Sequence, residues 1–209
     1  MRIAVFIKKT TFHRDYGGLE TQNKNLCEEL EKRGHEVYVF SPQLDYTGKK
    51  ILRDKDIHYV FVRSSYRSLA GFGHLDKNNW SNRSLEDFMF IHKQTPFDII
   101  LGQSSAALGL IKRKEEFDVP IISISHGTTI GEYKTRLQSL GGFKDWLKLI
   151  PDTAYVLLNF FKRQREFVLH SNKMIAVSNA VKEALVDETF VPEERVEVIY
   201  NGIDPSGIK

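Results

Sequence analysis

The 209 residues are 41% hydrophobic and 27% charged, which is typical of a water-soluble globular chain and sufficient for a single domain spanning 1–209. The net charge of +3 is too small to indicate nucleic-acid binding, and the single cysteine excludes an internal disulfide framework. No run reaches the roughly 18 apolar residues of a membrane span, and the apolar start is too short for a secretory leader, so we expect a cytoplasmic protein.

Short apolar runs rich in β-branched residues alternate with helical patterns along the chain. The runs predict strands at 3–7, 36–40, 57–62, 98–101, 120–125, 173–177 and 196–200. Helical patterns lie between them, at 19–33, 81–93, 105–116, 153–170 and 179–187. Because several strands are apolar on both faces, we expect a doubly wound α/β fold with a mostly parallel sheet between helices. Its ligand site would lie at the carboxyl ends of the strands, where the strand order reverses.

A pair of glycines separates the first predicted strand from the first predicted helix. Without a Cβ, Gly17 and Gly18 let the backbone turn tightly and approach a ligand. The free N–H groups and positive dipole end of the helix point at the same place, so the turn is a candidate site for phosphate or carboxylate. Glu20 would orient the turn or cap the helix start. The alternative is a turn that only connects strand to helix.

The first predicted helix has an apolar stripe that one polar residue interrupts. Leu26 and Leu30 belong to the stripe, and Cys27 beside them is expected to be a core thiol. Asn23 breaks the stripe, so it either faces the site or shifts the helix.

The fingerprints of dinucleotide and nucleoside triphosphate sites are absent. The glycine turn lacks Gly-x-Gly-x-x-Gly, and the second strand ends at Phe40 and Ser41 without an acidic residue for a ribose hydroxyl. A phosphate loop ending in Gly-Lys-Ser/Thr does not occur either. We therefore do not expect a nicotinamide cofactor.

Two long irregular stretches, 42–56 and 63–80, stand out from the alternating pattern. The second combines arginines with aromatic residues, which favours a binding loop with Tyr66, Arg67 and Trp80 as candidate ligand-binding residues. The first contains Asp54 and Asp56, whose oxygens could hold a divalent cation but whose mixed-charge setting is typical of a solvated turn. We assign no metal site.

Polar residues follow three of the predicted strands. His126 comes directly after the buried strand 121–125, where it could donate a hydrogen bond or move a proton, or else order its own loop; it is the candidate catalytic residue. Ser178 and Asn179 close the strand 173–177, where they cap the next helix and would face a ligand if the strand ends converge. The final polar turn consists of Asn201, Gly202 and Asp204.

The stretch 134–173 is the most cationic part of the chain. In 141–150, lysines alternate with aromatic and aliphatic residues, which fits contact with an anionic bilayer as well as packing. In 153–170, apolar residues at helical spacing predict a helix that packs on the sheet with its cations solvated.

Taken in order, these motifs resemble the N-terminal half of GT-B glycosyltransferases of the large retaining family 4. The resemblance covers nearly the whole chain and rests on the glycine turn at 17–20, the helix end at 33–37, His126 with Gly127, the segment 177–179 and the segment 198–204. It implies a Rossmann-like domain that mainly binds the acceptor and faces a second domain holding the nucleotide sugar.

The same resemblance implies roles for individual residues. Gly17 and Gly18 would approach the donor diphosphate, His126 would sit by the transferred sugar, and 201–204 would lead into the interdomain hinge. A UDP- or GDP-sugar would be the co-substrate, with no cofactor or metal required. The loop 63–80 and the segment 141–150 would select the acceptor.

We therefore expect the acceptor-side domain of a retaining, hexosyltransferase-like enzyme that acts on a glycan, a lipid-linked or a small-molecule acceptor. It would work in the cytoplasm or at the inner face of the membrane. The second domain with its E-x7-E signature is absent from this chain, so the chain alone is expected to be inactive. The alternative is a non-catalytic module of the same half-fold that binds a glycan, a lipid head group or a partner subunit.

Overall fold

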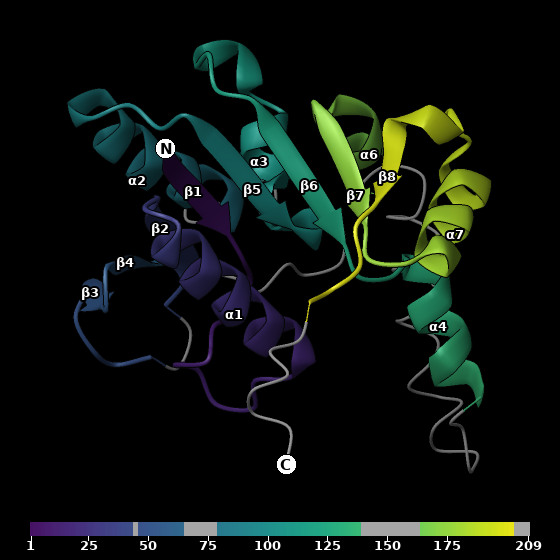
Figure 1. Cartoon of the computed structure of the whole chain (residues 1–209), viewed down its shortest axis with the longest axis horizontal. Coiled ribbons are helices and arrows are strands. Elements are labelled where there is room, and N and C mark those ends of the chain that lie inside the picture. The colour runs from purple at the N-terminus through teal and green to yellow at the C-terminus, as the bar shows by residue number, and fades with distance from the viewer. Residues whose placement is uncertain (44–45, 65–78, 139–163, 203–209) are drawn as a thin grey trace.

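The computed structural model describes residues 1–43, 46–64, 79–138 and 164–202 (Figure 1). These residues form one eight-stranded sheet in the order β3-β4-β2-β1-β5-β6-β7-β8, parallel except for the antiparallel pair β3–β4. The strands are β1 (Arg2–Phe6), β2 (Glu36–Pro42), β3 (Ile51–Asp54), β4 (Ile57–Val62), β5 (Ile99–Gln103), β6 (Ile121–Ser125), β7 (Lys173–Ala176) and β8 (Val196–Val198).

Helices cover both faces of the sheet, which confirms the expected doubly wound α/β fold. They are α1 (Gly18–Lys32), α2 (Trp80–Gln94), α3 (Leu108–Ile111), α4 (Thr129–Gln138), α6 (Arg165–His170) and α7 (Asn179–Thr189). Figure 1 shows α1 in front of the sheet, with α2 and α3 behind it. Cys27 of α1 packs on one face, and Phe88 of α2 and Leu185 of α7 pack on the other.

The central strand β1 is buried on both faces. Val5 points to the α1 side, whereas Ala4 and Phe6 point to the α2 side. The ring of Phe6 stacks on Phe40 of β2 at 4.7 Å between centroids and meets Phe88 edge-on at 6.0 Å. Burying both faces of such strands is the main favourable term in folding, at about 25 cal/mol for each Å² of apolar surface removed from water.

The first helix begins and ends where its glycines predict. Gly17 is the N-cap, and its N–H donates to Oε2 of Glu20 at 2.7 Å. At the other end Gly34 adopts φ +80°, a left-handed conformation that suits glycine. The N–H of His35 then donates to the carbonyl of Leu30 at 3.1 Å, which closes the last turn.

Three segments differ from the sequence-based expectations. The stretch 42–56 is not wholly irregular, because β3 forms within it as a short edge strand on β4. The polar helix α4 was not predicted. The single helix expected at 105–116 is instead a series of short turns, with Ser104–Ala107 and Lys114–Glu116 as 3-10 helices on either side of α3.

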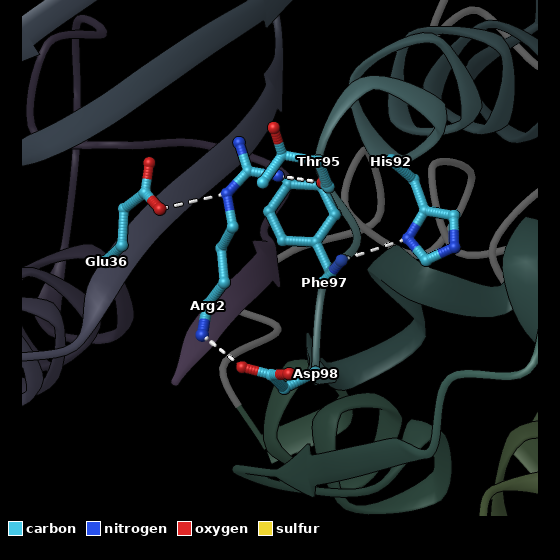
Figure 2. A network of polar contacts seen from close by, with 6 residues as sticks. All are labelled: Arg2, Glu36, His92, Thr95, Phe97 and Asp98. Carbon is cyan, nitrogen blue, oxygen red and sulfur yellow. Dashed lines mark hydrogen bonds and ion pairs between the residues drawn. The ribbon is translucent and has the colours of Figure 1, made fainter.

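Arg2 joins the amino ends of β1, β2 and the chain before β5 (Figure 2). Its Nε donates to Oε2 of Glu36 at 3.0 Å, and its Nη1 donates to the carbonyl of Thr95. The guanidinium carbon also lies 4.6 Å from the ring centroid of Tyr38 and 4.5 Å from that of Phe97. The two rings also meet each other edge-on, with 5.3 Å between centroids, so they form an aromatic corner beside this cation.

Two more polar contacts complete this edge. The carboxylate of Asp98 accepts from the backbone N–H of Arg2 at 2.6 Å, and Nδ1 of His92 accepts from the backbone N–H of Phe97 at 3.0 Å (Figure 2). Burial, with a smaller contribution from Arg2, lowers the pKa of His92. Burial also lowers the pKa of His58, whose ring stacks on Tyr38 at 4.5 Å.

Candidate functional site

The strand order reverses between β1 and β5. From β1 the chain moves outward through β2 and β4, and from β5 it moves the other way through β6, β7 and β8. In a parallel α/β sheet, the carboxyl ends of the strands at this reversal form the usual ligand site. The start of α1, the end of β5 and the residue after β6 all lie at this edge, which brings Gly17, Gly18 and His126 to one end of the sheet.

The glycine turn presents backbone rather than side chains. Gly17 and Gly18 are exposed, and the helix geometry leaves the first N–H groups of α1 without intrahelical partners. A Cβ built on Gly18 would meet no atom within 4 Å. The described fold therefore makes no steric demand for glycine at 18, and a demand would have to come from something that approaches the turn.

The loop that leads into this turn is held by a buried histidine. Nδ1 of His13 accepts from the backbone N–H of Thr10 at 2.9 Å, and its Nε2 donates to the carbonyl of Pro42 at 2.9 Å. Phe12 packs edge-on against Tyr59 of β4 at 4.8 Å. These contacts fix the position of the loop that precedes the glycine turn. The sequence around His13 contains no motif that indicates this role.

His126 is half-buried and hydrogen-bonded through one ring nitrogen. Its Nε2 lies 2.8 Å from Oε1 of Gln103, the last residue of β5. Because an amide oxygen can only accept, Nε2 carries the hydrogen. Burial lowers the pKa of His126, so the ring is neutral near pH 7 and Nδ1 has a free lone pair. Among the described residues, Nδ1 has no hydrogen-bond partner.

Gln103 connects His126 to the first helix. Its Nε2 donates to Oδ1 of Asn23 at 2.9 Å, and Nδ2 of Asn23 lies 3.7 Å from Sγ of Cys27. Asn23 is 2% exposed and Gln103 is 1% exposed. We call Asn23, Gln103 and His126 the relay. The break that Asn23 makes in the apolar stripe therefore faces the site, whereas nothing in the sequence marked Gln103.

The backbone next to Gln103 and next to His126 also has a defined conformation. Ser104, directly after Gln103, has φ +51°, a left-handed conformation that is uncommon for a residue with a Cβ. After His126, the hydroxyl of Ser125 donates to the carbonyl of Gly127 at 2.8 Å. The hydroxyl of Thr128 accepts from Gly131 at 3.0 Å, which caps α4.

The remaining sequence candidates fall into different places. Ser178 caps α7, because its hydroxyl accepts from the backbone N–H of Val181 at 3.2 Å, and Asn179 is exposed beside it. Asn201 and Gly202 are exposed after β8, and Gly202 lines a cavity of about 560 Å³ with residues of α1. Three candidates lie outside the described residues: Tyr66, Arg67 and Asp204.

The placement of Trp80 corrects the sequence-based expectation. Trp80 begins α2 instead of ending a loop, and its side chain is only 7% exposed. Its Nε1 donates to the carbonyl of Ala106 at 2.7 Å, and its ring meets Phe6 edge-on. This indole is part of the core and its polar atom is already used, so it does not serve as an exposed ligand contact.

The acidic and basic segments contribute little to the described site. Asp56 pairs with Arg53 beside β3, as expected of a solvated turn. Within the described ranges, no three His, Cys, Asp or Glu residues form a group that could hold a metal ion. None of the helices formed by the described residues has the length and apolar character needed to cross a bilayer. The segment 141–150 lies outside those residues.

The fold and the site geometry have a counterpart among known proteins. A profile of Glycosyltransferase Family 4 matches residues 16–206, a range that starts at the glycine turn and includes the whole relay. The chain belongs to this family. The family 4 chain is 30% identical over 207 residues to an alpha-monoglucosyldiacylglycerol synthase from Streptococcus pneumoniae. That match covers 98% of this chain and 41% of the relative.

Solved structures show the same GT-B fold. A sucrose-phosphate synthase from Thermosynechococcus elongatus superposes with a TM-score of 0.71 at 13% identity, covering 97% of this chain and 48% of that one. The O. sativa protein Os79, in complex with UDP, gives a TM-score of 0.55 at 10% identity over 96% of this chain and 51% of that one. This family 4 chain thus spans about half the length of the proteins it resembles.

Proposed function

We propose that this chain is the acceptor-side domain of a nucleotide-sugar-dependent glycosyltransferase whose acceptor is a diacylglycerol-type lipid. The observation that carries the proposal is the placement of the glycine turn and His126 at the strand-order reversal in a member of family 4. The lipid acceptor is supported by the relative that matches nearly the whole chain, because that protein is a glucosyldiacylglycerol synthase.

Each side of the site would have its own task. The backbone N–H groups of Gly18 and Leu19 at the start of α1 would bind the donor diphosphate, with help from the helix dipole. Glu20 would keep the turn in shape through the N–H of Gly17. His126 would accept a hydrogen bond from the transferred sugar through Nδ1. Donors fixed in advance of the reaction stabilise developing charge without reorganising, which is how such a site lowers a barrier.

The rest of the enzyme would come from a second domain. A hinge at Asn201, Gly202 and Asp204 would lead to it, and the nucleotide would bind mainly there. The partial coverage of the pneumococcal relative supports this arrangement, since 41% of that protein suffices to match this chain. A lipid acceptor would bring the domain to the inner face of the membrane, and the family supports retention of the anomeric configuration.

Turnover on a panel of UDP- and GDP-sugars tests the proposal. The chain would be assayed alone and together with the second half of the pneumococcal relative, with either diacylglycerol vesicles or soluble glycans as acceptor. We expect nucleotide release and a glycolipid product only with both halves and with vesicles. Product on soluble glycans alone would replace the lipid acceptor. Vesicle or glycan binding without any turnover, while the relative's own two halves turn over, would favour a non-catalytic binding module.

A further inference from the structure

We infer that Gln103 and Asn23 are positioning residues that place the ring hydrogen of His126 on Nε2 and so present Nδ1 at the carboxyl edge as a hydrogen-bond acceptor. The relevance of this arrangement to sugar transfer rests on the proposed function, whereas the arrangement itself can be tested without any reaction.

The orientations of the relay side chains depend on one another. Oε1 of Gln103 faces His126 and Nε2 of Gln103 faces Oδ1 of Asn23. If the Gln103 amide were turned over, its oxygen would face the oxygen of Asn23, and two acceptors would meet. The orientation of Asn23 therefore fixes that of Gln103, and Gln103 then fixes which nitrogen of His126 carries the hydrogen.

Burial makes this dependence strict. Asn23 and Gln103 are almost fully buried, so neither amide can exchange its partner for bulk water. A buried polar group without a partner carries the full cost of its desolvation, which penalises any arrangement in which one of the two amides alone is turned over. Nδ2 of Asn23 is itself used by the buried thiol of Cys27.

The relay also connects the two parts of the site. Asn23 belongs to α1, whose first turn is the glycine turn, and Gln103 ends β5 at the strand-order reversal. A shift of α1 toward or away from a ligand at Gly17 would therefore act on His126 through two short hydrogen bonds. The neutral ring would select ligands with a hydroxyl at that point, since Nδ1 can accept but has nothing to donate.

His13 provides a comparison within the same protein. It too carries its hydrogen on Nε2, but Nδ1 of His13 already accepts from Thr10. Both of its nitrogens are satisfied inside the fold, so its role is structural. Substitutions in the relay should leave His13 unchanged, which makes it an internal standard.

Nitrogen-15 NMR of the histidine rings in the 209-residue chain tests the inference. In the wild type we expect His126 to show hydrogen on Nε2, with an N–H signal that exchanges slowly with solvent. Gln103→Leu should abolish that slow exchange. Gln103→Glu should keep it and raise the pKa of His126, because a carboxylate favours the charged ring, and the Asn23 amide should turn over so that Nδ2 faces the new carboxylate. Asn23→Asp should also keep it, because a carboxylate oxygen still accepts from Gln103.

A matched substitution separates positioning from general loosening of the sheet. Ser123→Ala on β6 removes a buried hydrogen bond to Ser171 of 2.7 Å without touching the relay, so the His126 signal should stay as in the wild type. Hydrogen on Nδ1 in the wild type would overturn the inference, and so would slow exchange that survives Gln103→Leu. The wild-type measurement decides the matter even if a variant does not fold.

The two-half enzyme provides a second readout. Gln103→Leu should lower kcat by about ten- to a hundredfold, because a catalytic group that is displaced by about 1 Å can lose that much. The KM for the nucleotide sugar and the kcat of Ser123→Ala should change little. If the wild type shows the expected ring signal but no form transfers sugar, the proposed function fails and the relay stands. If transfer occurs while the ring carries hydrogen on Nδ1, the relay fails and the function stands.

Discussion

The two edges of this sheet differ in whether their polar side chains are fully hydrogen-bonded within the fold. At the amino edge, Arg2 donates to Glu36 and to the carbonyl of Thr95 (Figure 2). Its guanidinium also lies over the rings of Tyr38 and Phe97, so its hydrogen-bonding and cationic character is used inside the fold. At the carboxyl edge, the relay ends in a histidine whose Nδ1 has no partner among the described residues. The glycine turn beside it is exposed.

This contrast distinguishes structural polar groups from available ones. A polar network that closes on itself fixes the position of strands, and removing one member costs stability. A network in which the last member keeps an unused hydrogen-bonding atom holds that atom in position for a ligand. Variants at the two edges should therefore separate stability from activity.

The largest effect should come from His126→Ala at the carboxyl edge. Loss of a group that bonds to the reacting sugar should reduce kcat by about a hundredfold or more, whereas the orphaned amide oxygen of Gln103 should cost only about 1 kcal/mol of unfolding free energy. Kinetics on the two-half enzyme and urea unfolding of this chain measure both quantities. His92→Gln at the amino edge is the control and should keep kcat. A kcat within twofold of the wild type would remove His126 from the chemistry.

Arg2→Met should show the opposite pattern. Methionine keeps an apolar stem but loses the charge-assisted hydrogen bonds and the cation over the rings of Tyr38 and Phe97, so the free energy of unfolding should fall by about 2 kcal/mol with kcat unchanged. Urea unfolding measures the loss. Lys50→Met breaks an ion pair with Asp87 in which the lysine is 56% exposed, and it should cost less than about 1 kcal/mol. Equal costs for the two variants would mean that the amino edge network adds no stability.

Gly18→Ala sharpens the comparison at the glycine turn. The fold has room for the methyl group, and alanine favours a helix by up to about 1 kcal/mol over glycine, so stability should stay level or rise slightly. We expect nucleotide-sugar binding by the two-half enzyme to weaken about tenfold, or about 1.4 kcal/mol, measured by calorimetry. Gly34→Ala is the matched control, because φ +80° there should cost stability and leave binding intact. Unchanged binding in Gly18→Ala would make the turn a connector only.

The smallest effect should be the response to acid. The pKa values of His58, His92 and His126 are lowered in the folded chain, so the unfolded chain takes up protons first as the pH falls below about 6.5. The three neutral histidines make their full contribution to the free energy of unfolding above that pH. This contribution is lost as the pH falls through the pKa values of the folded chain. Urea unfolding at pH 7.5 and pH 5.5 should show the decrease, and His92→Gln should reduce it. A chain that is more stable at pH 5.5 would contradict the lowered pKa values.

Much of the sheet could be predicted because burial leaves a local signal. The strand 57–62 was predicted with the bounds that β4 has, since apolar residues fill both of its faces. The bounds of α1 followed from its two glycines to within one residue. The edge strand β3 was missed because its side chains alternate between intermediate burial and exposure, and pairing with β4 stabilises it. The helix α4 was missed because its apolar stripe is short, consisting of Ile130, Tyr133 and Leu137 among polar residues.

The site was harder to predict than the sheet, because its contacts join residues far apart in sequence. His126 was found from its position after a strand, and Asn23 was noticed as a polar break in a helix. Their connection runs through Gln103, which lies 80 residues from Asn23 and 23 from His126. A glutamine at a strand end has no spacing or motif that distinguishes it, so only the strand order reveals its role. The same limit applies to Trp80, whose partner at Ala106 is not local.

The burial of Cys27 has a practical consequence. It is the only cysteine in the sequence, it is fully covered by α1 and the sheet, and burial raises the pKa of its thiol to about 12. Because the thiolate is the reactive form, a thiol-directed alkylating reagent can modify Cys27 only when α1 lifts from the sheet. The rate of alkylation therefore measures the opening equilibrium of the helix that carries the glycine turn. An anion that binds at Gly17 in the closed form alone would slow that rate by a factor of one plus its concentration over its Kd, so a single native thiol can report ligand affinity without any label or assay of turnover.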